Sequence, residues 1–60
     1  MIEIQRLLAE TIAWRKEYAR RRDQHAPGTA QRRDFGLEAL ACAIRERAFR
    51  EALAALRRAP

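Results

Sequence analysis

The sequence predicts an all-α protein, an antiparallel hairpin of two long helices that dimerises into a four-helix bundle. Three observations predict this fold. Residues 2–24 contain neither glycine nor proline and consist mostly of good helix formers. A Pro-Gly pair at residues 27–28 then separates them from a second long helical segment. That second segment carries more apolar surface than one neighbouring helix can cover, which predicts a further interface.

The first helix is expected over residues 2–24, with one apolar face. Its apolar side chains recur at intervals of three and four residues, in the row Ile4, Leu7, Leu8, Thr11, Trp14 and Tyr18. Arg15 and Arg22 fall near the middle of this row. We expect their stems to cover the edge of the core while each guanidinium reaches water or a carboxylate.

The turn is expected over residues 25–29, and the second helix over residues 30–58. In the Pro27–Gly28 pair, proline disfavours helix in the residue before it and glycine permits a left-handed conformation. Thr29 is then suited to cap the second helix by accepting a hydrogen bond from a free backbone N–H. Asp34 is a competing cap, and its use would lengthen the loop.

Two apolar faces run along the second helix, separated by about a third of a turn or more. The first consists of Leu37, Leu40, Ala41, Ile44, Ala48 and Ala55. The second consists of Phe35, Cys42, Phe49, Leu53 and Leu56. Since packing against the first helix buries only one face, we predict that the second set forms an interface. A homodimer is the expected partner, with a different protein as the alternative.

The small size of the chain also favours association. A single domain of 60 residues buries little surface and usually needs a disulfide, a metal or a partner for stability. The sequence has one cysteine and one histidine, which excludes an internal disulfide and leaves too few ligands for a closed zinc site. Self-association or binding to a partner therefore remains as the expected source of additional stability.

The sequence offers no pattern typical of an enzyme, a cofactor site or a metal site. There is no serine, and the turn has one glycine and no lysine, unlike a phosphate-binding loop. Cys42 lies between alanines on an apolar face, so we interpret it as structural rather than as a nucleophile. The glutamate row of Glu3, Glu10 and Glu17 is interpreted as solubilising or ion-pairing.

Positive charge is concentrated at the expected hairpin end. The net charge of the chain is +5, and residues 15–34 hold seven of the thirteen basic side chains. The candidate polyanion-binding residues are Arg20, Arg21, Arg22, His25, Arg32 and Arg33. Guanidinium groups match phosphate geometry, which makes RNA or DNA a candidate partner. On the first helix Tyr18 is the nearest aromatic residue, and base stacking is not expected. A general bias of the composition towards arginine and alanine is an alternative explanation of the positive charge.

A membrane location is not expected. No apolar run approaches the ~20 residues of a membrane span, and the glutamates of the first helix disfavour a membrane-surface helix. The expected location is the cytoplasm, with a reduced thiol. Two functions follow as hypotheses: a non-enzymatic, self-associating interaction module that binds another macromolecule, or a nucleic-acid-binding regulator that uses the arginine-rich hairpin end.

Overall fold

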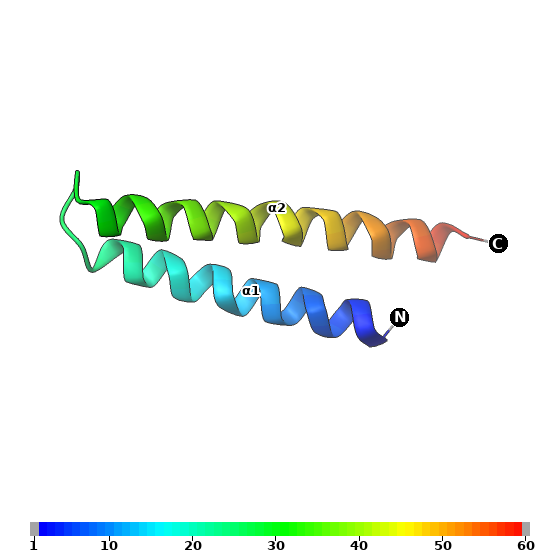
Figure 1. The fold of residues 1–60 in the computed structure, drawn as a ribbon. Helices are drawn as coiled ribbons and strands as arrows, with labels where there is room; N and C mark the ends of the chain where they lie inside the picture. The colour runs from blue at the N-terminus through cyan, green and yellow to red at the C-terminus, as the bar shows by residue number, and fades with distance from the viewer. Residues whose placement is uncertain (1, 60) are drawn as a thin grey trace.

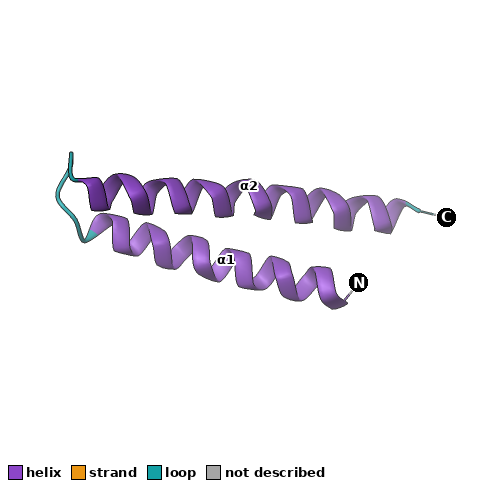
Figure 2. Ribbon diagram, viewed as in Figure 1, coloured by secondary structure: helices purple, strands orange, loops and turns teal. Residues whose placement is uncertain are grey.

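The computed structural model describes residues 2–59 and consists of two helices packed side by side in a hairpin (Figure 1). Helix α1 covers Ile2–Asp23 and helix α2 covers Ala30–Arg58. The hairpin measures 50 × 15 × 11 Å, and the longer α2 extends past the start of α1. No strand occurs among the described residues (Figure 2). The predicted all-α hairpin is therefore confirmed.

The turn between the helices depends on Gly28 and Thr29. Gly28 has a φ of +84°, a left-handed conformation that is strained for residues with a Cβ. The Thr29 side chain accepts a hydrogen bond from the backbone N–H of Arg32 at 3.2 Å and donates one to the carbonyl of Ala26 at 2.8 Å. Thr29 is thus the cap of α2, as the sequence predicted in preference to Asp34.

The interior of the hairpin is thin. Among residues 2–59, the buried hydrophobic side chains are Ala39, Cys42 and Leu53, all from α2, and α1 contributes only half-buried ones. Small side chains at positions 39 and 42 leave room for α1 to approach α2 closely. The two helices therefore have one shared seam rather than a core enclosed on all sides.

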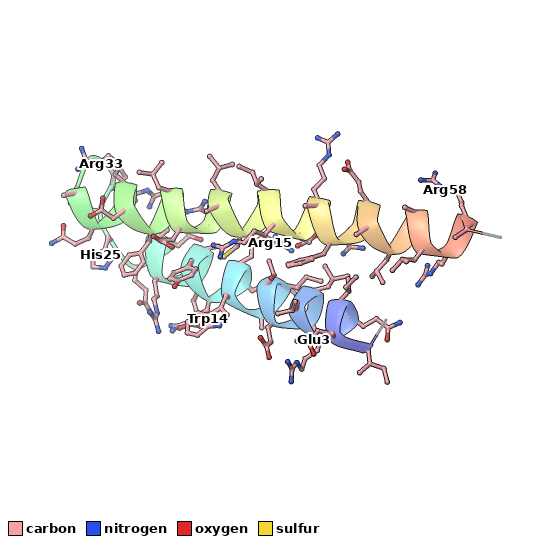
Figure 3. All side chains as sticks on the ribbon, turned by 45° about the vertical axis from the view of Figure 1, so that its right-hand side comes forward. Glu3, Trp14, Arg15, His25, Arg33 and Arg58 are labelled. Atoms are coloured by element: carbon pink, nitrogen blue, oxygen red, sulfur yellow. The ribbon has the colours of Figure 1, made fainter. Side chains whose placement is uncertain are left out.

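An ion pair crosses this seam. The Nε of Arg15 donates a hydrogen bond to Oε1 of Glu46 at 2.8 Å, and Figure 3 shows Arg15 lying between the two helices. Glu46 also accepts from Nε of Arg50, one helical turn further along α2. Desolvation raises the pKa of Glu46, but the hydrogen bonds from Arg15 and Arg50 together lower it below its ordinary value. The expectation that Arg15 reaches a carboxylate is confirmed.

Candidate interaction surfaces

The side of α2 that faces away from α1 is apolar and exposed. Leu37, Leu40 and Ile44 retain 59%, 57% and 64% of their surface exposed. Ile44 lies nine residues before the buried Leu53, which at 100° per residue places the two on opposite sides of the helix. We call this surface the outer strip. Its members are Arg33, Leu37, Leu40, Ala41, Ile44, Arg47, Ala48, Glu51 and Ala55.

The residues predicted to form a self-association interface lie elsewhere. Cys42 and Leu53 are buried on the α1 side of α2, Phe35 and Phe49 are half-buried, and Leu56 is 46% exposed. The face predicted to be left free therefore lies partly against α1, and the face predicted to pack there is the exposed one. Glu46 shares the inner face with Cys42 and Leu53, and its carboxylate is paired there with Arg15 of α1. This pairing could not be predicted from the sequence, because an acid on a helix face by itself disfavours burial of that face.

A shallow groove runs along one flank of the hairpin, where both helices contribute. Its volume is about 350 Å³. The side chains that line it are Leu7, Glu10, Thr11, Trp14, Tyr18, Cys42, Arg45 and Phe49. Trp14 remains 51% exposed and points away from α2 (Figure 3). The groove is open and has one carboxylate and one guanidinium at its edge, which gives it little capacity to shift a pKa for catalysis.

The hairpin end brings arginines from both helices together, as the sequence predicted. Arg22, Arg32 and Arg33 line a hollow of about 520 Å³ together with the backbone around Thr29. Figure 3 shows Arg33 and His25 at this end of the molecule. The first backbone N–H groups of α2 also lie here, so the end combines guanidinium groups with the positive end of a helix dipole.

Each arginine at this end also has an acidic neighbour. Arg20 and Arg21 both donate to Glu17, each through its Nε at 3.0 Å. The hydrogen bond from Arg20 is the largest cause that lowers the pKa of Glu17 from 4.5 to about 2, and the bond from Arg21 adds to it against desolvation. Glu17 in turn raises the pKa of Arg20.

Asp23 and Asp34 neighbour the remaining three arginines of the cluster. Asp23 lies 3.1 Å from Nε of Arg22 and 4.0 Å from Nη2 of Arg32, and Asp34 lies 3.7 Å from Nε of Arg33. Arg32 also donates to the carbonyl of His25 at 3.1 Å. These contacts organise the cluster and partly neutralise it, so its positive charge is smaller than the number of arginines suggests.

An aromatic row leads to the arginine cluster, contrary to the expectation from the sequence. Trp14 stacks on Tyr18 with ring centroids 5.5 Å apart, Tyr18 on Phe35 at 6.4 Å, and His25 on Phe35 at 5.5 Å. The row was not predicted because Phe35 belongs to the other helix and joins it only through the hairpin. Because the rings cover one another's faces, the exposed ring of Trp14 is the one best placed for a further stacking partner.

The residues that the structure describes offer neither a metal site nor a membrane-spanning helix. Within residues 2–59, no group of three histidine, cysteine, aspartate or glutamate side chains is arranged to hold a metal ion. Over the same residues, neither helix offers a stretch apolar enough to cross a lipid bilayer.

No known protein family, curated protein or solved structure matches the chain in comparisons of sequence and fold.

Proposed function

We propose that the chain is a small non-enzymatic interaction module whose first partner is a second copy of itself, bound through the outer strip of α2. The observation that carries this proposal is the exposure of Leu37, Leu40 and Ile44 on a chain whose described interior has only three buried hydrophobic residues. Three large aliphatic side chains on consecutive turns of one helix face form a contiguous apolar patch, and such patches mark interfaces.

The amount of exposed surface supports a partner of similar size. The hairpin exposes 4671 Å², whereas a compact folded monomer of 7.0 kDa is expected to expose roughly 4,000 Å². The excess of about 700 Å² is close to the ~800 Å² that each partner buries in a standard interface. The radius of gyration of 14.2 Å also exceeds the roughly 10 Å expected for a compact chain of this length.

This pairing gives a four-helix assembly of a particular kind. Because the outer strip lies opposite the seam with α1, the two copies of α2 occupy the centre and each α1 lies outside. The chain therefore associates as four helices, in a layer rather than in a closed square. Light scattering after size-exclusion chromatography tests the proposal. The expected mass is about 14 kDa, twice the chain mass of 7.0 kDa, and a folded monomer at micromolar concentration would contradict it.

A second candidate function is binding of RNA or DNA at the hairpin end. It is favoured by the hollow that Arg22, Arg32 and Arg33 line, and by the aromatic row that ends beside it. Phosphate binding would have to compete with Asp23 and Asp34 for these guanidinium groups, which is why this function stands second. Salt dependence separates the two functions, since phosphate contacts weaken steeply with salt and an apolar interface does not.

A further inference from the structure

The outer strip contains an internal symmetry that bears on how two copies meet. Arg33 and Glu51 lie 18 residues apart, five full helical turns, and therefore share one angular position on α2. Leu40 and Ile44 lie between them, one turn apart. The midpoint of both pairs falls at the level of residue 42. A twofold axis that crosses the strip at this level would bring both pairs opposite each other at once.

The charges decide between the two orientations that a symmetric helix pair can adopt. In a parallel pair every residue faces its own copy, so Arg33 would meet Arg33 and Glu51 would meet Glu51. In an antiparallel pair with its axis at residue 42, Arg33 faces Glu51 of the other copy twice, and Leu40 faces Ile44 twice. Opposite charges attract in the second arrangement and like charges repel in the first.

We propose that α2 pairs with α2 of a second copy in antiparallel orientation, with Arg33 of each chain opposite Glu51 of the other and Leu40 opposite Ile44. The inference rests on the proposed self-association and adds its orientation and register. The axis at residue 42 lies close to the middle of α2, so Ala30–Arg58 overlaps its copy over most of its length.

The neighbours of the two charged residues are compatible with this register. Arg33 faces Asp34 of its own chain at 3.7 Å, and Glu51 accepts from Nε of Arg47 at 3.1 Å. A carboxylate has room for two guanidinium groups, so Glu51 can keep Arg47 and gain Arg33 of the other copy. The same register places Arg47 opposite Leu37, where the stem of the arginine covers the leucine while its charge stays at the edge.

Charge reversal tests the register. Arg33→Glu and Glu51→Arg each replace two attractive contacts by two repulsive ones, so each variant should dimerise about 3- to 30-fold more weakly. The doubly substituted chain restores opposite charges at both contacts and should dimerise within a few-fold of the original. Equilibrium sedimentation gives the dissociation constants, and circular dichroism checks that the helices remain.

Net charge alone would give a different pattern. Arg33→Glu lowers the net charge and Glu51→Arg raises it, so a general repulsion effect would move their affinities in opposite directions. Matched controls are Arg45→Glu and Glu38→Arg, which make the same charge changes on exposed positions outside the outer strip. Both controls should dimerise like the original chain once the salt concentration is fixed.

The outcomes separate the register from the association. A monomeric original chain would overturn the proposed function and the register with it. An original dimer whose affinity is unchanged by both single reversals, or is not restored in the double variant, would overturn the antiparallel register alone. Weakening of both single variants with recovery in the double variant supports it, because a parallel pair predicts no change for any of the three.

Discussion

Ile44 and Leu53 lie on opposite faces of α2, one 64% exposed and the other 6% exposed. Both are large aliphatic side chains on the same helix, nine residues apart. A helix that packs against one neighbour needs only one of these faces, and the second apolar face is the one that we propose binds a second copy. The difference in exposure between these two residues carries the proposed function.

Acidic substitutions on the two faces should therefore have different effects. Ile44→Asp places a charge in the proposed interface, and the variant should sediment as a monomer with a melting temperature independent of protein concentration. Leu53→Asp buries an unpaired charge in the seam and should abolish helicity at every concentration. Ala9→Asp, at an exposed position on α1, is the matched control. A dimer of Ile44→Asp as tight as the original would show that the strip is not the interface.

Much of this fold could be predicted from the sequence, since its signals are local. Helix propensity, the Pro27–Gly28 pair and the Thr29 cap define two helices and a turn without reference to the rest of the chain. The rotation of α2 about its own axis could not be predicted in this way, because both of its faces are apolar. The face that packs on α1 is seen only through contacts between residues far apart in the chain, such as Arg15 with Glu46, 31 positions away.

The same difference separates the two features of the hairpin end: the arginine cluster could be predicted from the sequence and the aromatic row could not. The arginine cluster was predicted because any short turn brings Arg22 and Arg32 to one end of a hairpin. The aromatic row was missed because it requires Phe35 on α2 to lie next to Tyr18 on α1. Whether the two rings meet depends on how each helix is rotated about its own axis. Helix rotation is a tertiary property, and neither composition nor periodicity determines it when a helix has two apolar faces.

The two glycines should respond oppositely to alanine. Gly28→Ala places a Cβ on a residue with φ of +84° and should destabilise the fold by about 1–2 kcal/mol. Gly36→Ala adds a Cβ inside α2 at an ordinary 3.5 Å from Cδ of Arg22. It should stabilise the helix by up to about 1 kcal/mol. Urea unfolding at one protein concentration measures both changes, and a stabilising Gly28→Ala would contradict the turn geometry.

Cys42 should behave as a structural side chain. It is 3% exposed, with Nη2 of Arg45 lying 3.9 Å from its sulfur. A thiol reagent should therefore label the folded protein slowly and the urea-unfolded protein at once. Cys42→Ala should cost about 1 kcal/mol and preserve the oligomeric mass, because little volume is removed. Rapid labelling of the native thiol would restore the alternative of a reactive cysteine.

Acid should weaken the fold in part through Glu17. Its pKa is about 2 in the folded chain, against an ordinary 4.5, because Arg20 and Arg21 hydrogen-bond to its ionised form. The unfolded chain therefore binds the proton more readily, and the stabilisation is present above pH 4.5 and is lost as the pH falls towards 2. The free energy of unfolding at pH 6 and pH 3 should differ less in Glu17→Gln than in the original chain. Glu38→Gln, at an exposed position on α2, serves as the control and should leave the difference unchanged.

The second candidate function, binding of RNA or DNA, predicts that the arginine-rich end acts through phosphate contacts. Replacing Arg21, Arg22 and Arg32 with glutamine should remove three phosphate contacts, lower the salt slope by about 3 and weaken binding to all sequences alike. The variant with Arg45, Arg57 and Arg58 replaced by glutamine has the same net charge but an intact hairpin end, so it should bind like the original. Equal loss in both variants would indicate a general charge effect without a site.

The proposed antiparallel dimer would make this last prediction sensitive to the length of the duplex. Its two hairpin ends, each about 12 residues from the axis at residue 42, lie roughly 36 Å apart at 1.5 Å per residue. That separation is close to one turn of B-form DNA, about 34–36 Å. A duplex of about 20 base pairs can therefore contact both ends and should bind at least tenfold more tightly than one of about 8 base pairs, which reaches one end only. Ile44→Asp should bind both lengths with similar affinity, because a monomer has a single hairpin end. If the original chain binds no more tightly than about 10⁻⁴ M near physiological salt, the arginine-rich hairpin end is only a turn, residues 24–29, between two helices.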